Sequence, residues 1–221
     1  MPPALPPYLG GALLTLALSA VMLELAGTQR RMVLLAGVVG IAFTPMAVLF
    51  NGSYWNTSRL FGWPFGIEDV LYIFATGSSA WFFASWAGGP TRAAAPRPQL
   101  SPWRLIVITA GAMLALRLFT LAGLPPALSL YAIPAGLTML VLSRRSAFRR
   151  PALAGALGCV VLSLVVLRWC FWLWPHFRDD WVATSWTGQP LLSIPLGDLV
   201  WSAVFGATHP TVLLLALRTA R

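Results

Sequence analysis

The sequence predicts an all-α integral membrane protein, a seven-transmembrane helix bundle formed from two related halves. Hydrophobic residues make up 58% of the 221 residues, and the mean hydropathy is +0.76. Charged residues make up only 10%, whereas an ordinary soluble domain has about 25%. Seven long apolar segments follow one another, and two of them begin with closely similar acidic sequences. We therefore treat residues 1–221 as a single transmembrane domain.

The seven expected spans cover residues 8–26, 32–50, 67–87, 104–122, 127–143, 152–174 and 195–217. A helix needs roughly 20 residues to cross a bilayer, so all of these segments are suitable, although the fifth is short. The chain starts MPPALPPYLGG, with no basic segment before the first apolar run. We expect that run to be retained rather than cleaved as a signal peptide.

The basic residues give the expected orientation. All 15 are arginines, and the formal net charge is +9. They lie mostly in short loops between apolar segments, so the charge indicates membrane topology and not a nucleic-acid partner. Eleven fall on one side of a seven-span arrangement: Arg30, Arg31, Arg92, Arg97, Arg104, Arg144, Arg145, Arg149, Arg150, Arg218 and Arg221. This bias predicts an external N-terminus and a cytoplasmic C-terminus, and the wealth of Ala, Gly, Pro and Arg favours a bacterial cell membrane.

Two segments carry the same pattern of acidic and aromatic residues. Residues 65–74 read FGIEDVLYIF, and residues 194–205 read IPLGDLVWSAVF. Their alignment places Asp69 on Asp198 and Tyr72 on Trp201. Spans one to three (about 8–87) and five to seven (about 127–217) are therefore expected to be parallel repeats, linked by span four (about 104–122). Both acidic turns would lie at the same depth, around a cavity reached from the outer side.

Carboxyl groups at these positions suggest acid catalysis. Acidic residues are rare within membranes, and loss of water raises the pKa of a carboxyl group, which can then act as a general acid. The candidate acids are Glu68, Asp69 and Asp198, although a residue in the first turn of a helix can also serve as a cap. Aromatic rings would stabilise a cation in the same cavity. The expected lining residues are Tyr54, Trp55, Trp63, Tyr72, Trp181, Trp186 and Trp201.

Other polar residues are expected to be structural. Cys159 and Cys170 are eleven residues apart in one apolar run and are interpreted as ordinary core residues. His209 is expected to be buried and hydrogen-bonded rather than part of a proton relay, and Glu24 to form an ion pair with Arg30 or Arg31. The chain has no phosphate-binding loop, no zinc motif and no aspartate-rich motif for a Mg²⁺-bound diphosphate. We therefore expect no metal and no cofactor.

The two acidic segments resemble those of the lycopene cyclase domain. In that family a Pro-x-Glu-Glu/Asp motif, followed by aromatic and aliphatic residues, is repeated at the head of a helix. Here Gly66-Ile67-Glu68-Asp69 has Gly in place of Pro, and Pro195-Leu196-Gly197-Asp198 has Gly in place of the first acid. With these departures the chain is more similar to the small membrane-bound terpene cyclases of meroterpenoid pathways. The resemblance implies that Glu68 and Asp198 form the acid pair.

The function expected from these observations is proton-initiated cyclisation of an isoprenoid chain. The resemblance implies that the hydrophobic substrate is a prenylated aromatic such as a farnesylated indole, or its epoxide. One alternative is a lycopene β-cyclase of carotenoid biosynthesis. Another is a small-molecule or proton-coupled transporter, which would also use repeats and buried acids. A third is a membrane subunit without catalytic activity.

Overall fold

The computed structural model describes residues 5–46, 48, 51, 54–88, 99–181 and 189–218. Most of this part of the chain is helical, and a helix lies within each of the seven predicted segments. The long helices are α1 (Pro7–Leu25), α2 (Arg30–Ile41), α4 (Ile67–Gly88), α5 (Pro102–Leu121), α6 (Pro126–Arg144), α7 (Arg149–Leu173) and α8 (Leu196–Ala216). The short helices are η1 (Gly27–Gln29), η2 (Thr44–Met46), η4 (Ser146–Phe148) and η5 (Pro175–Asp180).

Four of the described helical segments are long and apolar enough to cross a membrane. They are α1, α5, α8 and residues Ser146–Leu173, which include α7. The other three predicted spans are helical but less typical of membrane spans. A shorter apolar helix covers Leu128–Arg144 within α6, and α4 contains a Thr-Gly-Ser-Ser sequence at residues 76–79. The structure thus shows a mostly helical protein with four such helices.

The second predicted span differs most from the expectation. Helix α2 ends at Ile41 after 12 residues, whereas the apolar run continues to residue 50. The short helix η2 then includes Pro45. Proline has no amide hydrogen to donate and disfavours helical geometry in the residue before it, which explains why an apolar segment stops being one continuous helix.

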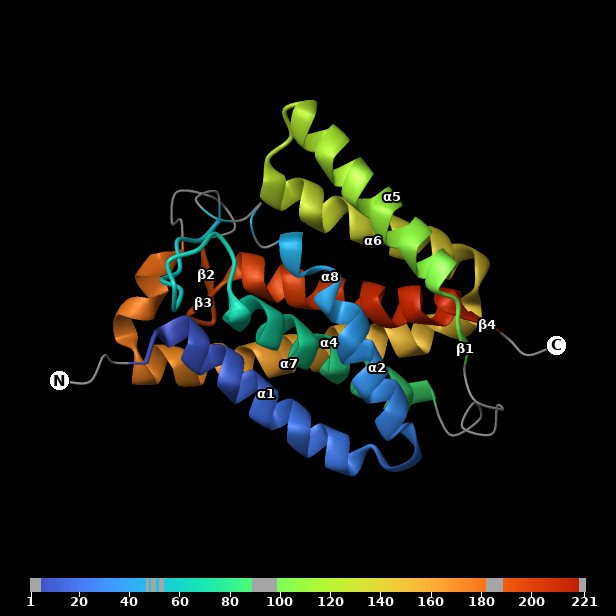
Figure 1. The fold of residues 1–221 in the computed structure, drawn as a ribbon, viewed down its shortest axis with the longest axis horizontal. Coiled ribbons are helices and arrows are strands. Elements are labelled where there is room, and N and C mark those ends of the chain that lie inside the picture. Colours follow the sequence, from blue (N-terminus) through green and yellow to red (C-terminus); the bar gives the residue numbers. More distant parts are fainter. Residues whose placement is uncertain are drawn as a thin grey trace.

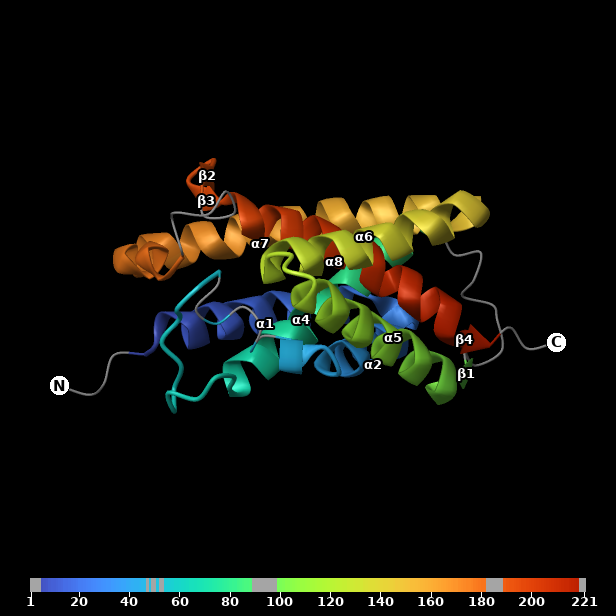
Figure 2. The same ribbon diagram turned by 90° about the horizontal axis from the view of Figure 1, so that it is seen from above.

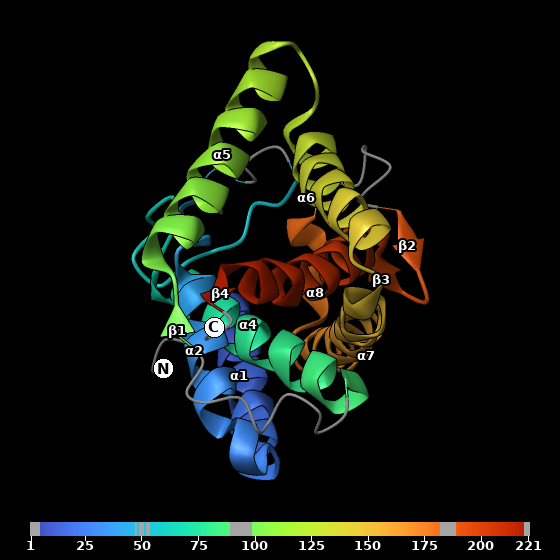
Figure 3. The ribbon, with the colours of Figure 1, turned by 90° about the vertical axis from the view of Figure 1, so that its right-hand side faces the viewer.

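The helices alternate in direction along the long axis of the molecule. Helices α4 and α8 both begin at the left-hand end in Figure 1, and Figure 2 shows the same from above. Helices α2, α5 and α7 run in the opposite direction and begin at the right-hand end. Helices α4, α7 and α8 form the centre of the packing, while α5 lies at the periphery against α6 and α8 (Figure 3).

Glycines allow the closest helix contacts. Gly77 on α4 lies against Gly40 on α2, and a methyl group at Gly77 would lie 3.0 Å from the carbonyl oxygen of Ala36. Gly206 on α8 lies against Gly155 on α7 so closely that a methyl group on either would overlap the carbonyl of the other. Gly77 and Gly206 each follow the aligned aspartate by eight residues, so the two acidic segments share a packing position as well as a sequence pattern.

A tight hairpin leads into α8. Strands β2 (Pro190–Leu191) and β3 (Ile194–Pro195) pair antiparallel, and the two turn residues Leu192 and Ser193 have φ values of 54° and 66°. Positive φ at both positions is typical of the type I′ turn that best matches strand twist. A second pair, β1 (Gln99–Leu100) with β4 (Leu217–Arg218), joins the start of α5 to the end of α8 at the opposite end.

Candidate functional site

A cavity of about 130 Å³ lies among helices of both halves of the chain. Its walls come from α4, α5, α6 and α8, with Tyr8 of α1 and the end of the α2 segment. Most of the lining is apolar, and the acids that line it are Asp69 and Asp198. One water needs roughly 10–15 Å³ by the same measure, so the cavity is large enough for an organic molecule. The lining residues are Tyr8, Phe43, Thr44, Tyr54, Trp55, Asp69, Tyr72, Ile73, Ile108, Ala112, Leu130, Ile133, Pro134, Leu137, Asp198, Trp201, Val204, Phe205, Thr208, His209 and Val212.

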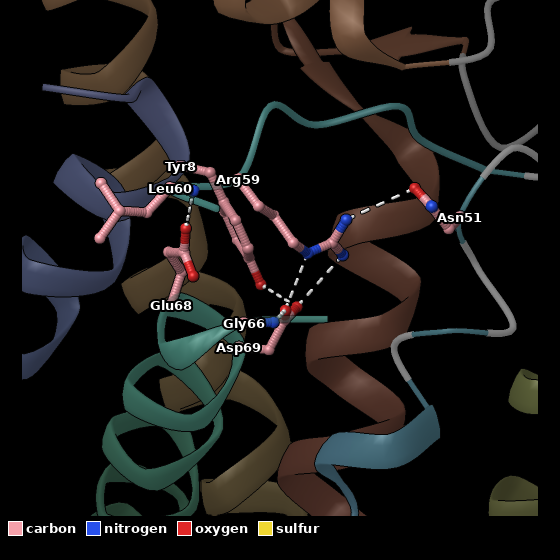
Figure 4. Close-up of polar contacts among 7 residues, drawn as sticks. All are labelled: Tyr8, Asn51, Arg59, Leu60, Gly66, Glu68 and Asp69. Atoms are coloured by element: carbon pink, nitrogen blue, oxygen red, sulfur yellow. Dashed lines mark hydrogen bonds and ion pairs between the residues drawn. The ribbon is translucent and has the colours of Figure 1, made fainter. Parts of the chain in front are cut away.

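Asp69 is a fully paired, buried carboxylate. The Arg59 guanidinium donates from Nε to Oδ2 at 2.9 Å and from Nη2 to Oδ1 at 3.3 Å, and both side chains are almost completely buried. The Tyr8 hydroxyl donates to Oδ1 at 2.8 Å, and the Gly66 amide donates to Oδ2 at 2.7 Å. Figure 4 shows these groups converging on one carboxylate. Four hydrogen bonds, two of them from a buried cation, stabilise the charged form.

Glu68 points away from Asp69, as Figure 4 also shows. Its Oε1 accepts a hydrogen bond from the Leu60 amide, and its side chain is fully buried. A methyl group at Gly66 would meet Oε2 of Glu68, so this carboxyl group packs directly against Gly66. The expectation that Glu68 and Asp198 share a cavity is therefore revised. Adjacent helical residues point about 100° apart, and in this turn it is Asp69 that faces the cavity.

Asp198 is buried without comparable partners. Its exposed fraction is 7%, and Oδ2 has no hydrogen-bond partner among the described residues. Three polar aromatic side chains lie near its carboxyl group: Tyr54, Tyr131 and Trp181. Burial, and then the nearby Asp198, raises the pKa of the Tyr54 phenol well above its ordinary value, so this hydroxyl keeps its proton. No arginine donates to Asp198 in the described part of the chain, in contrast to Asp69.

The residue before each helix explains part of this difference. Asp69 is the third residue of α4, and its carboxylate reaches back to the amide of Gly66, the residue that precedes the helix. This is the reciprocal half of a capping box. Asp198 is likewise the third residue of α8, but Pro195 precedes that helix and has no amide hydrogen. The equivalent capping bond therefore cannot form.

A row of aromatic rings follows one wall of the cavity. Tyr72 of α4 stacks on Trp201 of α8 with 5.8 Å between ring centroids. Trp201, Phe205 and His209 are spaced by four residues on α8 and stack in turn, at 4.9 Å and 5.1 Å. The spacing of four residues places them on one face of the helix. Because neighbouring rings cover part of each other, the row offers the cavity a mixture of ring faces and edges.

Residues shortly before α4 contact residues shortly after α7 near the acids. Trp55 forms a β-bridge with Trp181, their rings lie 6.0 Å apart, and the Asn56 amide donates to the Asp180 carbonyl at 2.7 Å. The loop after Asn51 is also tied to α4 through the Arg59–Asp69 pair. Residues from these two segments therefore cover the same end of the molecule.

Only some of the expected aromatic lining residues lie at the cavity. Tyr54, Trp55, Tyr72 and Trp201 line the cavity. Trp63 does not, because its side chain is 64% exposed beside Phe61. Trp181 is buried behind Trp55 and packs on Phe171 and Phe177. Trp186 lies outside the described residues.

Several structural expectations are confirmed. Cys159 and Cys170 are buried and free. His209 is buried and bonds the Ala36 carbonyl through Nε2 at 2.9 Å. Glu24 pairs with Arg30 at 2.9 Å.

Sequence reasoning missed three contributors to the site: Tyr8, Arg59 and Tyr131. Arg59 carried a usable signal, since it is one of only two arginines on the sparsely charged side of the predicted topology. Tyr8 and Tyr131 each lie near the start of their helices, at the same end as the acids. Nothing in their local sequences distinguishes them from tyrosines at a membrane interface.

No family model matches this chain, and neither a characterised protein nor a solved structure matches it.

Proposed function

We propose that the protein is a membrane-bound terpene cyclase in which Asp198 protonates an isoprenoid substrate. The observation that carries the proposal is the contrast between two buried aspartates in one apolar cavity. Asp69 has an arginine and two further hydrogen bonds to offset its charge, whereas Asp198 has an oxygen without a hydrogen-bond partner among the described residues. A buried carboxyl without such partners favours the uncharged acid. That acid is the form a general acid requires.

The proposed topology is seven spans in two parallel three-helix repeats. The repeat is supported by equivalent contacts: Gly77 packs on α2 as Gly206 packs on α7. Tyr72 and Trp201, which the alignment pairs, stack on each other. Equivalent residues touch in this way when they flank a two-fold axis, and here the axis would run parallel to α4 and α8.

The proposed orientation places the acidic end outside and the C-terminus in the cytoplasm of a bacterial cell. Arg30, Arg104, Arg144 and Arg218 all lie at the end where α2, α5 and α7 begin. The acids lie at the opposite end, where α4 and α8 begin. This distribution supports the positive-inside assignment.

The proposed reaction begins with proton transfer from Asp198 to the terminal alkene or epoxide of the chain. The π electrons of the next double bond then form a ring bond, and the positive charge moves along the chain. The Asp198 carboxylate and the surrounding rings of Tyr54, Trp55 and Tyr8 stabilise that charge. The apolar walls exclude water, which would otherwise capture the cation. The substrate class we favour is a prenylated aromatic such as a farnesylated indole.

The testing experiment compares Asp198→Asn with Glu68→Gln in membranes fed a farnesylated indole and its epoxide, with products followed by mass spectrometry. Asparagine keeps the shape of Asp198 but cannot give a proton, so we expect turnover to fall at least about 100-fold. Glutamine can still accept the Leu60 hydrogen bond, so Glu68→Gln should retain turnover near that of the wild type. Full activity of Asp198→Asn would refute the proposed acid.

The same experiment separates the alternative functions. Cyclised carotenoid in a lycopene-producing host would favour a lycopene β-cyclase. Movement of a substrate across the membrane without chemical change would favour a transporter. Absence of product from every prenylated aromatic and from lycopene, together with such transport, would reject the enzyme.

A further inference from the structure

Besides the two acids, the described residues that line the cavity include one basic side chain, the imidazole of His209. It is 2% exposed and lies on α8, eleven residues after Asp198. At 1.5 Å per residue the two side chains are separated by about 16 Å along the helix. The cavity therefore has an acid near one end and an imidazole deeper in the bundle, with Trp201 and Phe205 between them on the same wall.

The hydrogen bond of His209 indicates which ring nitrogen carries the proton. Nε2 lies 2.9 Å from the Ala36 carbonyl oxygen, which can only accept a hydrogen bond. Nε2 is therefore the donor, and Nδ1 of the neutral ring carries a lone pair. Nδ1 is buried and has no hydrogen-bond partner among the described residues. An unpaired acceptor in an apolar site carries a desolvation cost, so a role in binding or catalysis would explain it.

We infer that His209 is the base that ends the cyclisation, taking through Nδ1 the last proton from the substrate cation. This inference rests on the proposed function. Cyclisation that starts at Asp198 moves the positive charge along the chain towards the deeper part of the cavity, where His209 lies. There the electrons of a C–H bond next to the cation become the new C=C bond, and the proton binds Nδ1.

The proton balance closes over one turnover. Asp198 loses one proton to the substrate, and His209 gains one, so the product is an isomer of the substrate. The positive charge passes from carbon to the imidazole, while the negative charge remains on Asp198. Water that enters as the product leaves takes the proton from His209 and returns one to Asp198.

The packing of His209 suits this role. Phe205 stacks on the ring at an interplanar angle of 9°, and Phe43 meets it edge-on at 6.4 Å. Together with the Ala36 bond, these contacts fix the ring plane. A fixed base removes a proton from one position of a flexible cation, and this favours a single alkene product.

The test is the product spectrum of His209→Gln with the farnesylated indole that the wild type cyclises. A glutamine amide can still donate to the Ala36 carbonyl but is not a base. We expect the substrate to be consumed and the native alkene to fall at least tenfold as a share of products. Isomeric alkenes and alcohols formed by water capture should replace it. Gly136→Ala, whose added methyl meets no atom within 4 Å, is the control and should give the native product.

Two results would overturn the inference: the native alkene as the dominant product of His209→Gln, or a folded variant that no longer consumes substrate. The second result counts because protonation by Asp198 does not need His209. If His209→Gln fails to insert, His209→Phe, which keeps the ring stack, is tested by the same criteria. Failure of the proposed function is distinguishable, since wild-type protein would then form no cyclic product at all.

Discussion

At the scale of single residues, the site depends on two aspartates at equivalent positions with opposite surroundings. Asp69 receives bonds from Arg59, Tyr8 and the Gly66 amide. Pro195, three residues before Asp198, has no amide hydrogen to donate to it, and no arginine reaches Asp198 within the described chain. The two aligned aspartates thus differ: Asp69 is a structural carboxylate, and Asp198 is the candidate acid.

The ion pair between Arg59 and Asp69 should be essential for stability. Removing one partner leaves a buried charge unpaired, which costs about 3–5 kcal/mol. We expect Arg59→Met to lower the free energy of unfolding by this order and to loosen the loop that carries Tyr54 and Trp55. Thermal unfolding in detergent measures the effect.

The double variant Arg59→Met with Asp69→Asn is the control for that prediction. It removes both charges, so it should regain part of the stability that Arg59→Met loses. Equal losses in the single and double variants would show that the buried charge is not the cause.

Sequence reasoning placed Asp69 among the candidate acids, but the family resemblance assigned the acid pair to Glu68 and Asp198. The motif favoured Glu68, whereas Asp69 lines the cavity and Glu68 binds the Leu60 amide. The choice depends on the rotation of α4 about its axis, which long-range partners such as Tyr8 and Arg59 determine. A local pattern contains no information about those partners.

At the scale of helices, the glycine contacts determine how closely the central helices approach. Gly155 and Gly206 bring α7 and α8 together, and Gly40 and Gly77 do the same for α2 and α4. Pro210 contributes, because it has no amide hydrogen to donate to the Gly206 carbonyl one turn earlier. That carbonyl lies against Gly155 instead.

Substitution of Gly206 tests this packing. In Gly206→Ala the methyl would overlap the Gly155 backbone, and such overpacking typically costs about 1–3 kcal/mol. We expect a lower unfolding temperature. Gly136→Ala on α6 is the matched control, because its methyl meets open space and alanine favours a helix by about 1 kcal/mol over glycine. The account would be contradicted if both variants changed stability equally.

Helix positions were largely predictable from hydropathy, because long apolar runs specify membrane-type helices directly. The end of α2 was not, although Pro45 gave a local signal. The prediction of one long apolar span to residue 50 gave more weight to hydropathy than to Pro45. A proline alone does not predict where such a helix ends, because α6 and α8 continue through Pro134 and Pro210.

At the scale of the whole molecule, the two halves are similar in their packing but unlike in their chemistry. Aligned residues Tyr72 and Trp201 meet at the centre, and aligned glycines pack on α2 and α7. The first half supplies the Arg59–Asp69 ion pair, and Tyr54 and Trp55, which line the cavity. The other supplies Asp198 and the aromatic row of α8.

Exchange of the capping residues tests this division. Pro195→Gly restores an amide hydrogen at the position where Gly66 bonds Asp69, so Asp198 gains a donor that favours its charged form. We expect slower turnover at neutral pH. Pro190→Gly alters the strand partner of Pro195 without placing a donor beside Asp198, and should leave turnover closer to the wild type. Equal effects would point to loosening of the hairpin instead.

The most direct test of the central claim is infrared difference spectroscopy of the protonated carboxyl band at neutral pH. It needs no knowledge of the substrate. We predict that Asp198→Asn loses a component of this band and that Asp69→Asn does not, because Arg59 keeps Asp69 charged. A band that is unchanged in Asp198→Asn, or that loses the same component in Asp69→Asn, would contradict the assignment of Asp198 as the protonated acid.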